Sequence, residues 1–144
     1  MNGNLAQFGR DLQLHLYGLQ VSLTNINRLF SDDGAATSEA EFTNRLNELS
    51  TMTRDCSERT SALRKALESG LEQDAAIASE TVSRWIVRRQ SAQLHARADA
   101  IELLATIAVE LAALSTLEAE RITMAALLAR REAISVQVWH SKLE

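Results

Sequence analysis

The chain has 144 residues, of which 46% are hydrophobic, 24% charged and 4% aromatic, with five Gly and no Pro. This apolar content excludes a disordered chain, and the scarcity of Gly and Pro argues against a turn-rich β-sandwich or barrel. The formal charge of −4 gives no general attraction to nucleic acid or anionic lipid. A single Cys excludes an intramolecular disulfide framework and a Cys-based zinc site. We therefore expect one all-α domain over residues 1–144.

The first predicted helix covers residues 4–31. Its apolar residues recur at intervals of three and four, which places them on one stripe of an α-helix. They are Leu5, Phe8, Leu12, Leu16, Leu19, Leu23, Ile26 and Phe30. The run that ends at Gly34 closes the helix, since Gly takes the positive φ of a helix terminus readily.

The second predicted helix covers residues 38–69. Ser38 and Glu41 form a capping box, in which each side chain bonds the backbone N–H of the other residue. A heptad pattern follows at Phe42, Leu46, Leu49, Thr53, Cys56, Thr60, Leu63 and Leu67. Ser69 and Gly70 are expected to end the helix. The two helices are predicted to form a helical hairpin with coiled-coil-like packing.

Residues 71–143 form a long helical segment without Gly or Pro, through which the apolar phase can be followed. As a single helix it would measure roughly 105 Å at about 1.5 Å per residue. Capping boxes at 99–102 and 115–118 offer breaks near residues 98 and 115. A break at either place gives a four-helix up-down bundle, whereas an unbroken helix leaves an apolar overhang that needs a partner.

The three histidines do not belong to a known metal-binding motif. His15, His95 and His140 have no Glu three residues before them, so the Glu-x-x-His pairs of helical di-iron sites are missing. The sequence also lacks a His-Glu-x-x-His run, a phosphate-binding glycine loop and a nucleophile elbow. Cys56 lies on the apolar seam and is interpreted as a small hydrophobe. We expect no enzyme and no catalytic, cofactor or metal site.

The apolar stretch Ala100–Leu114 is wide for a helix with one neighbour. We interpret it as a contact surface for a protein partner, with core packing as the competing interpretation. The candidate contact residues are Ile101, Leu104, Ala108, Leu111 and Leu114. Because Glu102 and Glu110 interrupt the stretch and a spanning helix needs about 20 apolar residues, we expect a buried helix segment and no transmembrane segment.

Basic residues gather between Arg84 and Arg97. The candidate strip consists of Arg84, Arg88, Arg89 and Arg97, which would suit phosphates or an acidic partner. The interpretation that we favour is a solvated helix face paired with acids from neighbouring helices.

These patterns predict a non-catalytic protein that acts through protein–protein association, including self-association. A scaffold, adaptor or chaperone-type subunit of a larger assembly would have this character, and the preference for Arg over Lys is typical of GC-rich bacterial genomes. The alternative is an amphipathic protein that binds a membrane or lipid surface reversibly, and the third candidate is nucleic-acid binding through the basic strip. We expect a cytoplasmic protein, or one exported without a cleaved signal peptide.

Overall fold

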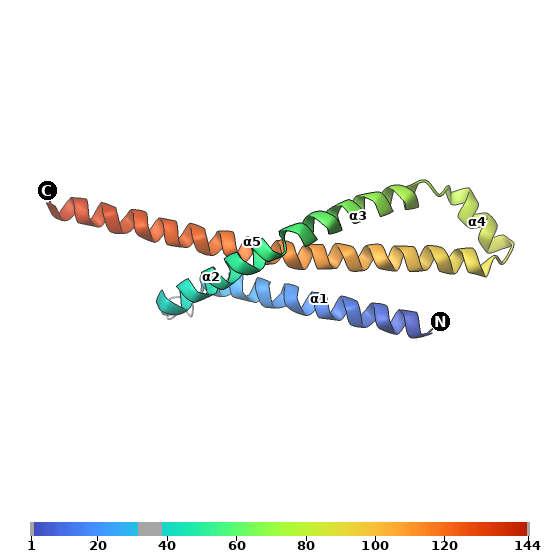
Figure 1. Cartoon of the computed structure of the whole chain (residues 1–144), viewed down its shortest axis with the longest axis horizontal. Coiled ribbons are helices and arrows are strands. Elements are labelled where there is room, and N and C mark those ends of the chain that lie inside the picture. Colours follow the sequence, from blue (N-terminus) through green and yellow to red (C-terminus); the bar gives the residue numbers. More distant parts are fainter. Residues whose placement is uncertain (1, 32–38, 144) are drawn as a thin grey trace. The chain divides into compact units, whose positions relative to one another are not determined.

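The structure, a computed structural model, describes residues 2–31 and 39–143. Within these ranges the chain forms helices and no strands (Figure 1). The helices are α1 (Asn2–Leu29), α2 (Glu39–Asp55), α3 (Ser57–Ala75), α4 (Ser79–Val87) and α5 (Ser91–Leu143). The predicted all-α fold with a long C-terminal helix is confirmed. Gly34 and the Ser38 cap lie outside the described residues.

The chain divides into two compact units. The first unit consists of Met1–Gly18 and Ser57–Ala113, and the second consists of Leu19–Cys56 and Leu114–Glu144. Helices α1 and α5 each contribute residues to both units. A single domain over residues 1–144 stays a prediction.

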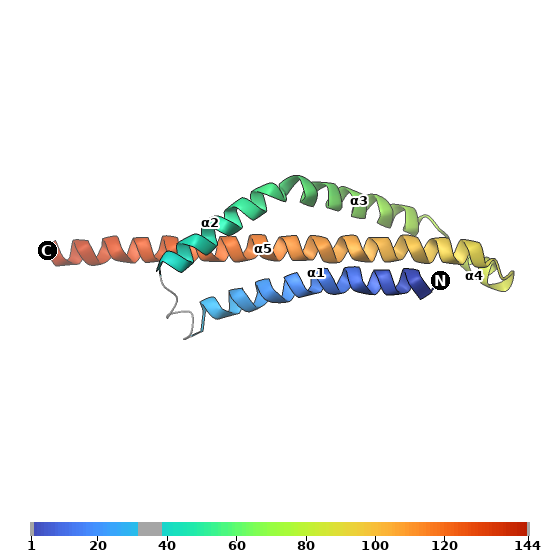
Figure 2. The same ribbon diagram turned by 60° about the horizontal axis from the view of Figure 1, so that its bottom comes forward.

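The second unit has a small hydrophobic core where α2 packs on α5. Phe42 and Leu49 of α2 and Met124 of α5 are buried. Partly buried leucines surround them: Leu29, Leu46, Leu117, Leu127 and Leu128. Figure 2 shows the ribbon of α2 against that of α5, as Figure 1 does. Among the described residues of the first unit, one apolar residue is buried, Leu63 of α3.

The inward face of α1 differs from the predicted stripe. Most of its covered positions follow a heptad rhythm: Phe8, Leu12, His15, Leu19, Ser22, Ile26 and Leu29 are half-buried or buried. Gly9, Asp11 and Asn25 are half-buried outside this rhythm. Leu16, Leu23 and Phe30, which the prediction placed on the stripe, are exposed, as is Leu5. The prediction followed the apolar residues, but a regular a/d register turns a polar His15 and Ser22 toward the neighbours instead.

The predicted heptad of residues 42–67 is confirmed, because all eight of its positions are buried or half-buried. The expected single helix is wrong in two respects, since it is interrupted at Cys56 and continues past Gly70 to Ala75. Before the interruption, the hydroxyls of Ser50, Thr51 and Thr53 donate to carbonyls one turn earlier. Such bonds compete with the backbone hydrogen bonds of the helix for the same carbonyl groups, which favours an interruption.

Gly70 lies within α3 and does not end it. A Cβ built on Gly70 would collide with Leu104 of α5, whose Cγ would be only 3.2 Å away. The missing side chain therefore lets α3 and α5 approach each other within the first unit. Gly70 is a packing residue and not a helix terminator.

The segment predicted as continuous from residue 71 is broken on both sides of α4. At its C-terminal end, Gln90 N–H donates to Trp85 C=O (2.8 Å) and Arg89 N–H donates to Ile86 C=O (3.1 Å). Arg89 has a φ of 53°. These are the bonds and the left-handed residue of a Schellman motif, in which Gly is usual. The sequence pattern missed this break because Arg occupies the glycine position.

Helix α5 continues through both predicted breaks, near residues 98 and 115, so the four-helix interpretation of this segment is wrong. Ser115 lies inside this continuous helix, so the second capping box does not form, and the carboxylate of Glu118 accepts hydrogen bonds from the Arg121 guanidinium on the next turn instead. In a continuous helix the backbone N–H and C=O groups bond to each other, so no cap is needed. A sequence that could form a cap therefore does not end the helix where the spacing of apolar residues continues unchanged.

Candidate functional site

The C-terminal end of α5 carries exposed apolar side chains. Every residue from 129 to 143 is exposed. We call the following residues, which are exposed by 46–78%, the terminal apolar surface: Ile134, Val136, Val138, Trp139 and Leu143. In Figures 1 and 2 the red end of α5 continues past the ribbons of α1 and α2. At about 100° per residue, Ile134 and Val138 lie on one side of the helix and Val136, Trp139 and Leu143 on the other. Exposed hydrophobic residues gathered at one helix end are typical of interaction surfaces.

The predicted partner-contact residues on the apolar stretch of α5 do not form one exposed face. Ile101 and Ala108 are exposed, whereas Leu104, Leu111 and Leu114 are half-buried. Leu104 packs on α3 beside Gly70. The expected buried helix segment is also not found, because none of residues 100–114 is fully buried. A helix packed against neighbours on part of its circumference leaves the remainder in solvent.

By length and composition, α5 could cross a membrane, and it is the one helix of the described residues that could. An 18-residue window within it has a mean hydropathy of 1.8, and none of that window is fully buried. The apolar stretch of α5 also contains a charged residue, because Glu110 forms an ion pair with Arg59 of α3. The absence of a transmembrane segment stays a prediction.

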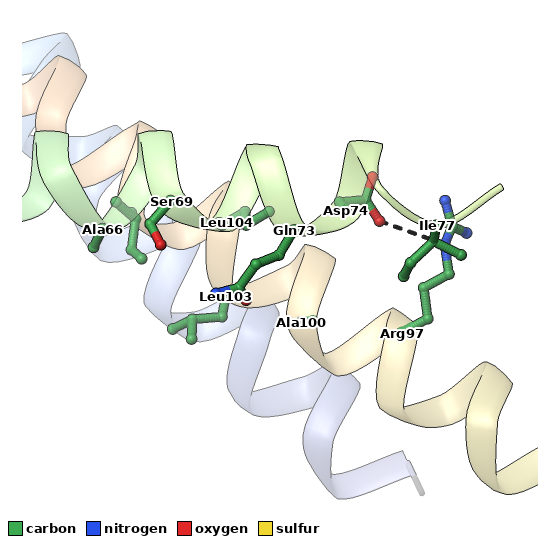
Figure 3. Close-up of a pocket in the computed structure, with 11 residues that line it drawn as sticks. Ala66, Ser69, Gln73, Asp74, Ile77, Arg97, Ala100, Leu103 and Leu104 are labelled. Atoms are coloured by element: carbon green, nitrogen blue, oxygen red, sulfur yellow. Dashed lines mark ion pairs between the residues drawn. The ribbon is translucent and has the colours of Figure 1, made fainter.

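A groove of about 440 Å³ lies between α3 and α5 in the first unit. Its walls are largely aliphatic, and its lining includes Ala66, Ile77, Ala100, Leu103, Leu104 and Ile107. Figure 3 shows Asp74 and Arg97 at one end and Ala66 and Ser69 at the other. Gly70 and Leu104, at which the two helices meet closely, both line the groove. The sequence analysis did not find it.

Arg97 places a charged group at the end of this groove. Its Nε lies 3.5 Å from Oδ1 of Asp74, which is an ion pair but not a hydrogen bond. Of the buried side-chain nitrogen and oxygen atoms in the described residues, this Nε alone has no hydrogen-bond partner. A buried N–H without a hydrogen-bond acceptor is unfavourable, which the nearby charge of Asp74 offsets in part.

The structure divides the predicted basic strip. Arg84 lies on α4, and Arg88 and Arg89 form its C-terminal turn; all three are exposed. Arg97 lies on α5, half-buried, and pairs with Asp74. The turn after α4 interrupts the strip, so the four residues do not share one helix face. Pairing with an acid of a neighbouring helix, the interpretation favoured from sequence, is found at Arg97.

A partly buried ion pair joins α2 to α5 in the second unit. The Nε and Nη2 of Arg45 donate to the two carboxylate oxygens of Glu120, at 3.0 and 3.1 Å. These hydrogen bonds, opposed by desolvation, raise the pKa of Arg45 above its ordinary value. Nearby, the Arg131 guanidinium lies 5.0 Å from the centroid of the Phe42 ring. The sequence analysis missed Glu120, although it occupies a heptad position between Leu117 and Met124.

A second bidentate pair joins α3 to α5 in the first unit. Arg59 donates from Nε and Nη2 to Glu110, at 2.8 and 2.9 Å. These hydrogen bonds lower the pKa of Glu110, and the charges of Arg59 and His15 act in the same direction against desolvation. The hydrogen bonds from Arg121 likewise lower the pKa of Glu118, to which Thr53 also contributes. Both carboxylates are thus tuned to stay charged, which suits a structural role.

The residues considered for chemistry are dispersed. Cys56 is half-buried at the interruption between α2 and α3, His15 is half-buried on α1, and His95 and His140 are exposed on α5. Within residues 2–31 and 39–143, no three His, Cys, Asp or Glu side chains are grouped so that they could hold a metal ion.

Comparisons with known proteins contribute no functional information. No protein-family model, curated protein or solved structure matches this chain.

Proposed function

We propose that this protein is a non-catalytic helical protein that acts by association with another protein chain, in the first instance a second copy of itself. The observation that carries the proposal is the terminal apolar surface of α5. Removal of such a surface from water lowers the free energy by about 25 cal/mol per Å² of apolar surface. A scaffold or adaptor subunit of a larger assembly would use the surface in the same way.

The isolated character of this helix end supports the proposal further. A helix segment of about 15 residues without tertiary packing is marginally stable in water. Every side chain of residues 129–143 is exposed, so packing within the monomer stabilises this stretch little beyond the contact of Arg131 with the Phe42 ring. A second helix that packs against Ile134, Val138 or Trp139 would supply the missing stabilisation.

Sedimentation velocity of the full chain at micromolar concentration tests the proposal. We expect a dimer or larger species, which the double substitution Ile134→Ser and Trp139→Ser shifts toward the monomer. The matched control is Ile86→Ser with Val87→Ser, which removes two exposed apolar residues of α4 and should leave the association unchanged. A wild-type chain that stays monomeric at tens of micromolar would overturn the proposal.

The second candidate function is reversible binding to a membrane surface, which the apolar window of α5 favours. Insertion of the apolar stretch would require release of Glu110 from Arg59 or burial of this charged pair. Co-sedimentation with vesicles of anionic and zwitterionic lipid distinguishes the two functions. Binding to vesicles without self-association in solution would favour the membrane function.

A further inference from the structure

The exposed end of α4 carries arginines next to aliphatic side chains. In Figures 1 and 2, α4 lies at one end of the first unit, between the end of α3 and the start of α5. We propose that this end of α4 binds the surface of an anionic lipid bilayer, with Arg84, Arg88 and Arg89 at the headgroup phosphates and Ile86 and Val87 inserted between the headgroups. The contact uses neither the terminal apolar surface nor the apolar window of α5, so it goes beyond the proposed association.

The aliphatic side chains lie on the side of α4 that does not pack on the rest of the unit. Thr81, Val82 and Trp85 are half-buried and form the covered side. Ile86 and Val87 are 61% and 81% exposed. Val87 follows Trp85 by two residues, which at about 100° per residue places it on the opposite side of the helix. Both side chains can therefore enter an apolar phase without a rearrangement of the fold.

The arginines around these side chains have no acidic partner. Arg84 and Arg88 are one turn apart on the same side of the helix, Arg89 follows them, and all three are exposed. In the part of the chain that the structure describes, none of their guanidinium groups forms an ion pair. The acidic residue of α4 is Glu80, in its first turn. Each arginine near an anionic bilayer raises the partition coefficient about fivefold.

The backbone conformation of Arg89 points to a role for its side chain. Its φ of 53° is unfavourable for a residue with a Cβ, and glycine is usual at this position of a Schellman motif. Residues held in unfavourable backbone conformations gather at functional sites. Because the turn would form more readily with glycine, the arginine indicates a function of the guanidinium that the fold itself does not require.

The combination of charges and aliphatic side chains favours a bilayer over a soluble polyanion. The phosphates of a nucleic acid would attract the arginines equally well, but they offer no apolar phase to Ile86 and Val87. In a bilayer the headgroups lie directly above the acyl chains. Cations and aliphatic side chains at one helix end are then accommodated together.

Co-sedimentation of the full chain with vesicles tests the proposal. We expect binding to vesicles of equal parts phosphatidylglycerol and phosphatidylcholine, and binding at least about tenfold weaker to vesicles of phosphatidylcholine alone. Added salt should weaken the binding to the anionic vesicles, because it screens the arginines from the bilayer. Equal partition coefficients for the two kinds of vesicle would overturn the proposal.

Substitutions in α4 locate the contact. Arg89→Gly should weaken binding to anionic vesicles about fivefold although it relieves the unfavourable φ, so unfolding would not explain the loss. Arg89→Lys retains the charge and should bind like the wild type. Arg64→Gln, which removes an exposed arginine of α3, is the matched control and should change binding little. Unchanged binding of Arg89→Gly would argue against the assignment.

The aliphatic side chains separate the bilayer from other anionic partners. Ile86→Ser with Val87→Ser should weaken vesicle binding at least about tenfold, because less apolar surface leaves water. Circular dichroism checks that this variant stays helical. If the same variant binds the anionic vesicles as tightly as the wild type, only charge acts and the proposal is wrong. Binding to duplex DNA without binding to vesicles would assign the arginines to nucleic acid instead.

Two double variants distinguish this contact from the proposed association. Ile86→Ser with Val87→Ser should lose vesicle binding and keep the sedimentation behaviour of the wild type. Ile134→Ser with Trp139→Ser should shift toward the monomer and keep the preference for anionic vesicles. Loss of that preference in the second variant would place the lipid contact on the terminal apolar surface and overturn the assignment to α4.

Discussion

Arg45 and Glu120 form a two-point ion pair in the second unit, in which Nε and Nη2 of the arginine donate to both carboxylate oxygens of the glutamate. The Glu120 side chain is only 2% exposed, whereas that of Arg45 is 29% exposed. The pair joins α2 to α5 beside the core of Phe42, Leu49 and Met124. Burial of a carboxylate is tolerable here because one guanidinium satisfies both of its oxygens.

Removal of the arginine should therefore destabilise the second unit strongly. We expect Arg45→Ala to lower the free energy of unfolding by about 3 kcal/mol, because it leaves a buried carboxylate without its cation. Urea denaturation followed by circular dichroism measures the change. Arg54→Ala, at an exposed position of α2, is the control and should have little effect. The double variant Arg45→Met with Glu120→Leu should recover most of the loss; a double variant as unstable as Arg45→Ala would refute this account.

Acid should weaken the Arg59–Glu110 pair. Since the pKa of Glu110 is lowered in the folded protein from its ordinary value of 4.5, the unfolded chain binds the proton more tightly than the folded chain. The contribution to stability is fully present above 4.5 and is lost as the pH falls through the lower folded-state pKa. Denaturation of wild type and Glu110→Gln between pH 3 and about 7 should give a stability difference that shrinks with acid. A difference that does not depend on pH would contradict the cause assigned to this shift.

The glycines of α1 and α3 should respond differently to alanine. A Cβ at Gly9 or Gly18 meets nothing within 4 Å, so each substitution should stabilise the helix by about 0.5–1 kcal/mol. Gly70→Ala gains the same helix propensity but must displace Leu104. We expect it to be less stabilising than Gly9→Ala, or destabilising, in thermal unfolding. Equal stabilisation at the three positions would show that Gly70 has no packing role.

Arg89 should be a favourable site for glycine. Its φ of 53° is unfavourable for a residue with a Cβ, by about 1–2 kcal/mol, and glycine removes that cost. Arg89→Gly should therefore raise the free energy of unfolding by about 1 kcal/mol, provided that α4 unfolds with the rest of the chain. Arg88→Gly is the control, because Arg88 has a φ of −85° and gains nothing from glycine. Stabilisation by both substitutions, or by neither, would argue against the Schellman turn.

The helical character of the chain and the buried face of residues 42–67 could be predicted from periodicity, because an apolar residue every three or four positions must be covered along one side of a helix. The missing catalytic motifs could likewise be read from the sequence. These properties depend on spacing along one helix, which the order of residues determines. An exposed apolar overhang was expected only if residues 71–143 formed one helix, and its position was not predicted: the candidate contact residues lay between Ile101 and Leu114, whereas the exposed apolar residues of the helix end lie at 134–143.

Tertiary packing decided the remaining features. Which side of α1 faces inward, with His15 and Ser22 in place of Leu16 and Leu23, depends on the register of the neighbouring helices. The chain turns at Arg89 although the sequence has no glycine there, and α3 continues through Gly70, where a Cβ would meet the side chain of Leu104. The groove at Arg97 and the pairing of Arg45 with Glu120 join residues 23 and 75 positions apart. Distances across a fold of this kind are set by how helices pack, and periodicity along a single helix contains no information about them.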